Sequence, residues 1–264
     1  MKIGFIGCGN MGGTMMQAML DAGKCAPENI MASARSEERL RLRKEQMGVQ
    51  VTTDNRRVAA FAETLFLAVK PQCYEKVIEE IREQVTADQL IVTIAPGKTL
   101  DWLAGTFGRE LKIIRAMPNA PAMVRAGMMA LCPNARVSEE ELAGFRELCS
   151  SFGSTEVVEE HLMDVVTAVA GSSPAYVFMF IEAMADAAVA AGMSRAASYK
   201  FASQAVLGSA KMVLDTGKHP GELKDMICSP GGTTIEAVRV LEEKGMRSAV
   251  FEAVKACVDK SRGM

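Results

Sequence analysis

The spacing of hydrophobic positions in this chain changes near residue 160. Before that point, short continuous apolar runs alternate with longer stretches in which apolar residues recur with helical spacing. Strands that alternate with helices are typical of a parallel sheet covered by helices on both faces. We therefore predict an α/β domain over residues 1–159. Its strands are expected at residues 2–6, 30–33, 49–51, 64–69, 90–94, 112–116, 127–132 and 154–158.

The rest of the chain contains no comparable strand pattern, and its helical stretches are separated by Gly and Pro. This predicts an all-helical second domain over residues 160–264, with helices at 161–191, 195–216, 221–228 and 233–262. The uncharged stretch 165–181 contains Gly171, Ser172, Ser173 and Pro174 at its centre, which should break a membrane helix. We expect a buried segment with a functional turn there.

The first predicted strand leads directly into the pattern Gly-x-Gly-x-x-Gly, formed by Gly7, Gly9 and Gly12, and a predicted helix follows. In that setting the first glycine permits a tight turn, the second admits a pyrophosphate, and the third lets the helix pack close to the strand. The helix N-terminus then offers N–H groups to the anion. The pattern favours a Rossmann domain with a doubly wound, mostly parallel sheet that binds a dinucleotide, although an ordinary glycine-rich turn is the alternative.

The second predicted strand ends in Ala34, Arg35 and Ser36, where a site for NAD usually carries Asp or Glu. A guanidinium can bind a 2′-phosphate and a hydroxyl can donate to it, so NADP(H) is favoured, with NAD(H) as the weaker alternative. Arg35 could instead be a solvated charge, and Ser36 could cap the next helix. Asn55 is placed either to reach the adenosine half of the cofactor or to cap a helix.

Composition narrows the functional class further. Hydrophobic residues make up 49% and charged residues 23% of the 264 positions, and the net charge of −2 gives no basic surface for nucleic acid or an anionic membrane. Seven cysteines without a C-x-x-C pair and only two histidines argue against a disulfide framework and against a metal site. The first strand begins at residue 2, so we expect no targeting peptide and a cytoplasmic location.

Turns rich in Gly and Pro follow three of the expected strands, at residues 68–71, 95–97 and 117–121, at the sheet edge where ligands bind in open α/β folds. Two more turns, at residues 170–176 and 229–235, combine Ser or Thr with Gly and Pro just before a predicted helix. Such turns can present N–H groups and hydroxyls to a substrate carboxylate, or they can simply cap helices.

With these segments and the run 219–225 (His-Pro-Gly-Glu-Leu-Lys-Asp), the chain resembles the pyrroline-5-carboxylate reductase family from end to end. The resemblance implies hydride transfer from NAD(P)H to the C=N carbon of 1-pyrroline-5-carboxylate, giving L-proline. It also implies a homodimer, or a higher oligomer built from dimers, through the helical domain. Ser173 stands where the family usually has glycine.

The resemblance carries site residues over by position. The implied cofactor residues are Ile6, Gly7, Cys8, Gly9, Asn10, Met11, Ser33, Ala34, Arg35, Ser36, Asn55, Ala68, Val69, Lys70 and Pro71. The implied substrate residues are Ser172, Ser173, Ser229, Gly231, Gly232, Thr233 and Thr234. The Thr234 hydroxyl is expected near the ring nitrogen, as the candidate catalytic group.

The residue inventory favours an imine over an alcohol as substrate. Oxidation of a hydroxy acid needs a base such as His or Lys, but His161 and His219 lie outside the nucleotide crevice and the two small-residue turns. A cyclic imine can arrive protonated, so the protein mainly has to orient it. Two alternatives stay open: a β-hydroxyacid dehydrogenase, although neither Lys211 nor Lys224 lies in that family's Lys-x-x-x-Asn pattern, and a non-enzymatic NADPH-binding sensor.

Overall fold

The computed structural model describes residues 1–263, which divide into two compact units. The first unit contains Met1–Gly171 together with the chain from Val258 onward, and the second contains Ser172–Cys257. Each unit is described by itself below.

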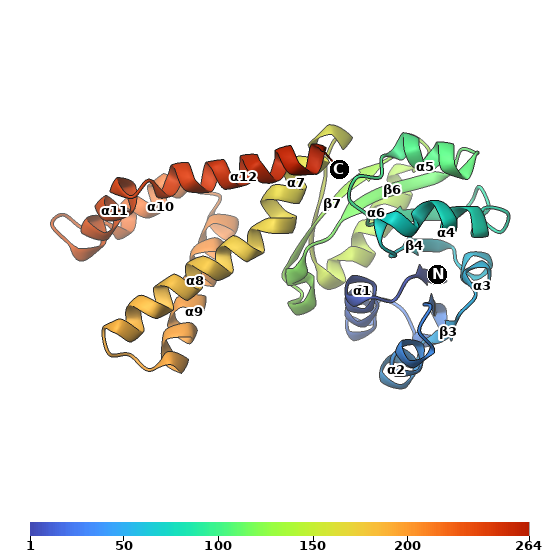
Figure 1. The fold of residues 1–264 in the computed structure, drawn as a ribbon, viewed down its shortest axis with the longest axis horizontal. Coiled ribbons are helices and arrows are strands. Elements are labelled where there is room, and N and C mark those ends of the chain that lie inside the picture. The colour runs from blue at the N-terminus through green and yellow to red at the C-terminus, as the bar shows by residue number, and fades with distance from the viewer. Residues whose placement is uncertain (264) are drawn as a thin grey trace. The chain divides into compact units, whose positions relative to one another are not determined.

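A single mixed sheet forms the centre of the first unit (Figure 1), with the strand order β3-β2-β1-β4-β5-β6-β7-β8. Among the described residues every neighbouring pair is parallel except β6 with β7. The strands are β1 (Ile3–Ile6), β2 (Ile30–Ser33), β3 (Gln50–Thr52), β4 (Thr64–Leu67), β5 (Leu90–Thr93), β6 (Lys112–Met117), β7 (Gly127–Pro133) and β8 (Gly153–Val157). All eight predicted strands are present, and the doubly wound, mostly parallel sheet is confirmed.

Helices cover both faces of this sheet because its strands are apolar on both sides. On β4, Leu65 and Leu67 pack into one core cluster, whereas Phe66 between them packs into the other and stacks on Phe5 at 4.5 Å. The first cluster is completed by α3 (Asn55–Phe61), α4 (Tyr74–Ile81) and α5 (Leu100–Phe107), and the second by α1 (Asn10–Asp21), α2 (Glu37–Met47) and α6 (Glu139–Cys149).

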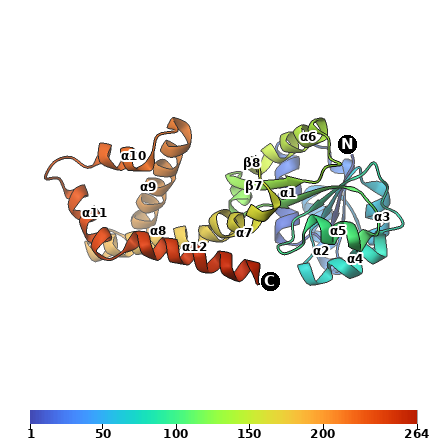
Figure 2. The ribbon, with the colours of Figure 1, turned by 90° about the horizontal axis from the view of Figure 1, so that it is seen from above.

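The second unit is helical, and α8 packs against α9 within it (Figures 1 and 2). Its helices are α8 (Ser173–Ala190), α9 (Arg195–Thr216), α10 (Pro220–Ile227), α11 (Thr233–Glu243) and α12 (Met246–Arg262), the last of which continues into the first unit. The single helix predicted over 233–262 is wrong. Gly245 adopts φ +72°, a left-handed conformation that separates α11 from α12.

The segment before α8 also differs from expectation. The residues Gly171–Pro174 do not break the helix: α7 (Met163–Val166) continues through a π-helical turn at Thr167–Ser172 into α8. By length and composition the helical stretch Glu160–Ala190 could cross a membrane, with a mean hydropathy of 1.4, and only 6% of its most apolar window is buried. The expected burial of 165–181 is therefore wrong for the single chain, because much of this helix is exposed.

Candidate functional site

The glycine turn after β1 has the shape that close approach of an anion requires. Gly7 adopts φ +100°, and an added Cβ would lie 2.6 Å from the Ala68 carbonyl oxygen. A Cβ on Gly12 would lie 2.7 Å from the Gly7 oxygen, whereas one on Gly9 would meet no atom within 4 Å. Gly7 and Gly12 are thus required by the protein itself. The backbone at Gly9, beside the start of α1, stays open, as the predicted approach of a pyrophosphate requires.

Hydrogen bonds bring three of the predicted cofactor segments to this one edge of the sheet. The Gly7 N–H donates to the Ser33 oxygen at 3.0 Å, and the Ala68 N–H donates to the Ile6 oxygen at 2.8 Å. Ile6, Cys8 and Ser33 are buried, so these residues support the edge from within the fold. Asn10 and Met11 form the first turn of α1 beside them, where no side chain caps the helix.

Ser33 and Asn55 form a small polar network beneath the adenosine end of the predicted site. The Ser33 hydroxyl donates to Asn55 Oδ1 at 2.6 Å, and Asn55 Nδ2 donates to Glu80 Oε2 at 2.9 Å. Asp54 caps α3 by accepting from the Arg56 N–H at 2.9 Å, so the alternative in which Asn55 is the cap is wrong. Asn55 instead links the ends of β2, α3 and α4.

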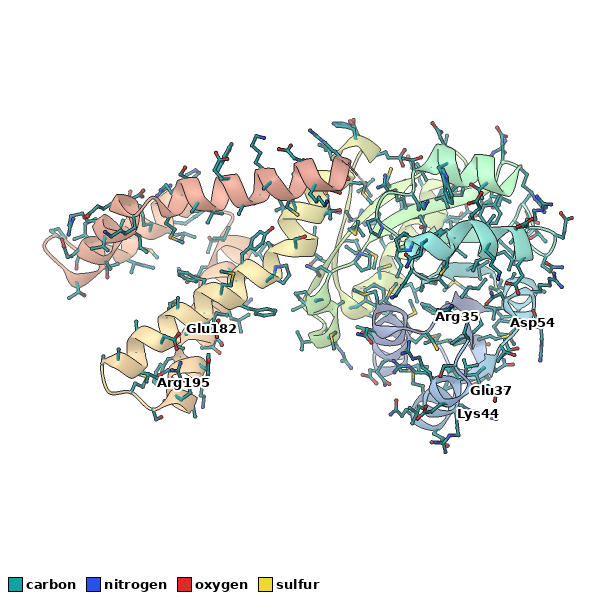
Figure 3. All side chains as sticks on the ribbon, viewed as in Figure 1. Arg35, Glu37, Lys44, Asp54, Glu182 and Arg195 are labelled. Carbon is teal, nitrogen blue, oxygen red and sulfur yellow. The ribbon has the colours of Figure 1, made fainter. Side chains whose placement is uncertain are left out.

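Arg35 and Ser36 stand exposed before α2, next to half-buried Ala34. Figure 3 labels Arg35 together with Glu37 and Lys44 of α2. The Ser36 hydroxyl oxygen accepts from the Arg39 N–H at 3.3 Å, so the capping interpretation of Ser36 is confirmed. Capping uses an oxygen lone pair and leaves the hydroxyl hydrogen able to donate, so it does not exclude a phosphate contact. Burial raises the pKa of the Cys8 thiol, and the positive charges of Arg43 and Arg39 partly offset this effect, which places positive charge close to the glycine turn.

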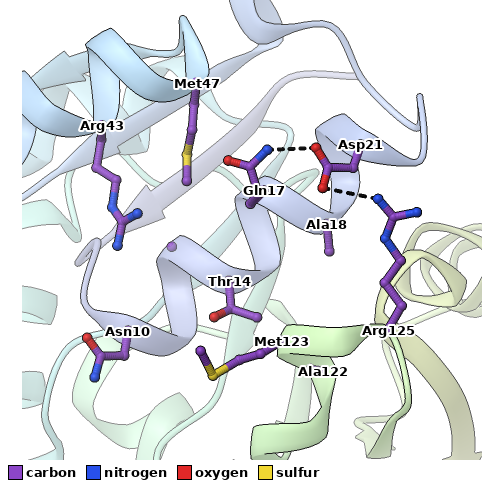
Figure 4. A pocket seen from close by; sticks show the side chains of 11 residues that line it. Asn10, Thr14, Gln17, Ala18, Asp21, Arg43, Met47, Ala122, Met123 and Arg125 are labelled. Atoms are coloured by element: carbon purple, nitrogen blue, oxygen red, sulfur yellow. Dashed lines mark hydrogen bonds and ion pairs between the residues drawn. The ribbon is translucent and has the colours of Figure 1, made fainter.

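A pocket of about 280 Å³ runs along α1 from this turn (Figure 4). The Arg43 guanidinium lies over Gly13, where an added Cβ would be 2.3 Å from Nη2. Arg125, whose φ of 58° is left-handed, pairs with Asp21 at 3.0 Å. The lining residues are Asn10, Gly13, Thr14, Gln17, Ala18, Asp21, Arg43, Met47, Ala122, Met123 and Arg125. Of these, only Asn10 is among the predicted site residues. The others lie further along α1, on α2, or in the segment 120–125, which the fold brings against α1.

The segment Ala68–Pro71 follows β4, with Ala68, Val69 and Pro71 half-buried and Lys70 exposed. Tyr74 anchors this segment from below. Its hydroxyl donates to the Leu67 oxygen and accepts from Thr93 Oγ1 at 3.0 Å. Burial raises the pKa of Tyr74 to about 12, so the phenol stays neutral and its hydrogen bonds hold the ends of β4 and β5 in place.

The turn before α11 has the features of an anion site. Gly231 is exposed with φ +67°, and Gly232 is an N-cap without a side chain to occupy the first N–H groups of the helix. A Cβ on Gly232 would lie 2.5 Å from Ser229 Oγ, so the serine packs over the glycine. Thr233 is exposed and Thr234 half-buried at the helix start. This arrangement leaves N–H groups and hydroxyls available together.

The other predicted substrate turn is helical. Ser172 ends the π-helical turn and Ser173 begins α8, both half-buried. The Cys257 thiol donates to Ser172 Oγ at 3.3 Å. Burial, and then the neighbouring Cys257 thiol, raise the pKa of Tyr176 one helical turn further on. A π-helical turn is frequently found at functional sites.

Both histidines have surface positions. His219 caps α10, with its Nδ1 accepting from the Gly221 N–H at 3.0 Å, and exposed His161 lies 3.2 Å from Glu159. His219 is therefore held by the helix it begins.

Two family models match the chain. The model described as pyrroline-5-carboxylate reductase dimerisation matches residues 160–264, and the model described as NADP oxidoreductase, coenzyme F420-dependent, matches residues 2–97. A curated pyrroline-5-carboxylate reductase from Escherichia coli (strain K12) is 54% identical over 260 residues, which cover 98% of this chain and 97% of that protein.

Solved structures agree with this comparison. A pyrroline-5-carboxylate reductase from Coxiella burnetii superposes with a TM-score of 0.92 at 34% identity, covering 99% of this chain and 97% of that chain. Pyrroline carboxylate reductase from Plasmodium falciparum, solved with NADP bound, superposes with a TM-score of 0.89 at 30% identity over the same shares of the two chains.

Proposed function

The chain belongs to the pyrroline-5-carboxylate reductase family, and from this membership we propose how its own residues carry out the family's reaction. It is an oxidoreductase that acts on the C=N bond of 1-pyrroline-5-carboxylate and forms L-proline, the last step of proline biosynthesis, with NADP(H) as cofactor. The identity of 54% over nearly the whole chain carries this conclusion. The β-hydroxyacid dehydrogenase and sensor alternatives have no comparable support.

We assign cofactor binding to the sheet edge at Gly7. The Gly7 and Gly9 turn and the uncapped start of α1 would hold the pyrophosphate, and exposed Arg35 with Ser36 would bind the 2′-phosphate. Asn55 and Ser33 would support the adenosine end through their mutual hydrogen bond. When bound, the cofactor supplies the hydride. The protein orients the cofactor and places positive charge beside its phosphates.

The substrate carboxylate is assigned to the turn Ser229–Thr234, where the N-terminus of α11 lacks a side-chain cap. The Thr234 hydroxyl would hydrogen-bond the ring nitrogen, with Ser172 and Ser173 as further contacts. Because an iminium already carries its proton, we propose that Thr234 orients the substrate and is not an essential acid.

The helical unit, as the family's dimerisation region, is proposed to form a homodimer. Large apolar side chains are exposed on it, among them Phe178 at 64%, Phe201 at 68% and Phe251 at 69%, and such surface is usually covered by a partner. The same pairing would cover part of the apolar helix 160–190, which supports a cytoplasmic rather than a membrane location.

The test is loss of NADPH or NADH absorbance on addition of 1-pyrroline-5-carboxylate. Imine-dependent loss, faster with NADPH, is the expected result, and turnover only of hydroxy acids would refute the proposal. Arg35→Ala should raise KM for NADPH by about tenfold and leave KM for NADH unchanged, since one charge-assisted hydrogen bond is removed. Lys44→Ala, which removes an exposed cation in the last turn of α2, the helix that follows Arg35, is the matched control.

A further inference from the structure

The carbonyl of Ala170 lacks the partner that a regular helix would provide. In an α-helix it would accept from the N–H of residue 174, but residue 174 is proline and has no N–H. Ala170 lies in the π-helical turn Thr167–Ser172, immediately before the predicted substrate residues Ser172 and Ser173. In the π-helical register the next backbone donor for this carbonyl is the N–H of residue 175, and a side-chain donor can supply the bond that the α-helical register does not.

Asn119 provides that donor. Its Nδ2 donates to the Ala170 oxygen at 3.0 Å, across 51 residues of sequence. Asn119 lies just after β6, in the proline-rich segment at the carboxyl edge of the sheet, and is 9% exposed. One side-chain amide therefore joins the edge of the sheet to the irregular turn.

A second hydrogen bond fixes the amide of Asn119 in this orientation. The Met128 N–H, in the strand after the same loop, donates to Asn119 Oδ1 at 2.9 Å. With its oxygen held by β7, the amide can only direct its NH₂ group at Ala170. The donor is thus oriented before any substrate binds.

We propose that Asn119 is a positioning residue for the reductase reaction, because its amide replaces the hydrogen-bond donor that Pro174 lacks and holds the π-helical turn that presents Ser172 and Ser173. This inference rests on the proposed function of those two serines as substrate contacts. Asn119 itself acts through the backbone at Ala170.

The chain offers a matched control for this residue. Asn134 makes the same two kinds of bond elsewhere in the unit: its Nδ2 donates to the Leu111 oxygen at 2.8 Å, and its Oδ1 accepts from the Ile113 N–H at 3.2 Å. Asn119→Asp and Asn134→Asp each keep the accepting oxygen and remove the donor. Both variants also add a carboxylate, so the charge change is matched, and each takes the donor from a different backbone carbonyl. Asn134 is half-buried, whereas Asn119 is buried, and the Asn134 Oδ1 also accepts from the Arg136 N–H at 3.3 Å.

We expect Asn119→Asp to raise KM for 1-pyrroline-5-carboxylate by about tenfold, the effect of losing one hydrogen bond, without changing KM for NADPH. Asn134→Asp should leave both KM values unchanged. Hydrogen exchange measured by mass spectrometry should become faster in peptides covering residues 167–176 for Asn119→Asp and not for Asn134→Asp. Equal imine KM values in the two variants, or unchanged exchange at 167–176, would overturn the inference.

Pro174→Ala tests the same idea without altering Asn119. It returns an N–H to position 174, the donor that the Ala170 carbonyl would use in α-helical register, and Asn119→Asp should then raise the imine KM less than it does in the parent protein. An undiminished effect would contradict the proposal. If the parent protein fails to reduce the imine, the proposed function fails, whereas the exchange comparison still decides whether Asn119 holds the turn.

Discussion

The buried ion pair between Arg115 and Glu160 provides a sharp test of how β6 is joined to the segment that follows β8. Arg115, on β6, is only 5% exposed, and its Nη1 donates to Glu160 Oε1 at 3.1 Å. The same oxygen accepts from the Leu100 N–H at 2.8 Å, and Arg115 Nε has no partner among residues 1–263. Glu160→Ala would therefore leave a buried guanidinium without a counter-charge.

The size of the effect follows from this burial. Breaking a buried pair by removing one partner costs about 3–5 kcal/mol. The Glu160 side chain is 30% exposed, so water can enter on its side, and we expect a loss of about 3 kcal/mol in the free energy of unfolding. Replacing both members, in Arg115→Met with Glu160→Ala, should recover most of this loss because no unpaired charge remains.

The assay is urea unfolding followed by circular dichroism at one fixed protein concentration, since oligomer formation makes stability concentration-dependent. Glu45→Ala is the control. It breaks an exposed pair with Arg41 in the same unit, at 3.5 Å and with the two side chains 68% and 57% exposed for Arg41 and Glu45, and should cost less than about 1 kcal/mol. Similar losses for Glu160→Ala and Glu45→Ala would refute the reasoning.

Three further results are expected. Gly9→Ala should keep the melting temperature but weaken NADPH binding in a fluorescence titration, whereas Gly7→Ala, with its Cβ 2.6 Å from Ala68, should lower both; normal NADPH binding by Gly9→Ala would contradict the assigned pyrophosphate site. Because the folded pKa of Tyr74 is raised to about 12 from its ordinary 10.0, its contribution to stability is complete below pH 10 and is lost as the pH rises toward 12. Tyr74→Phe should cost about 1–2 kcal/mol at neutral pH and lack this alkaline loss in urea unfolding, and an unaltered alkaline loss would exclude Tyr74 as its source. Thr234→Ala should raise the imine KM by about tenfold in steady-state assays with only a modest fall in kcat, and a collapse of kcat at unchanged KM would identify Thr234 as an essential acid.

Features formed by residues close together in the sequence could largely be predicted from it. The strand after Met1, the glycine turn and the capping of α2 by Ser36 depend on short patterns, and the structure has each of them. Two wrong predictions concern helix ends, where the same residue types can either end a helix or lie within it. At Gly245 and around Gly171–Pro174, glycine and proline mark an irregularity without saying whether the helix ends or continues. The helix ends before Gly245, where φ is +72°, but continues through Gly171–Pro174 by way of a π-helical turn.

The sequence by itself determined the alternation of strands and helices, the dinucleotide turn and the family resemblance, because these depend on side-chain periodicity and on the special backbone freedom of a few glycines. Only the tertiary structure decided the partners of Asn55, Asn119 and Arg115, which lie 22, 51 and 45 residues away from the groups they bind. A polar side chain has several possible partners in an extended chain. Once buried in the folded core, the side chain can no longer hydrogen-bond water. It must then bond the neighbouring group that the strand order brings within reach.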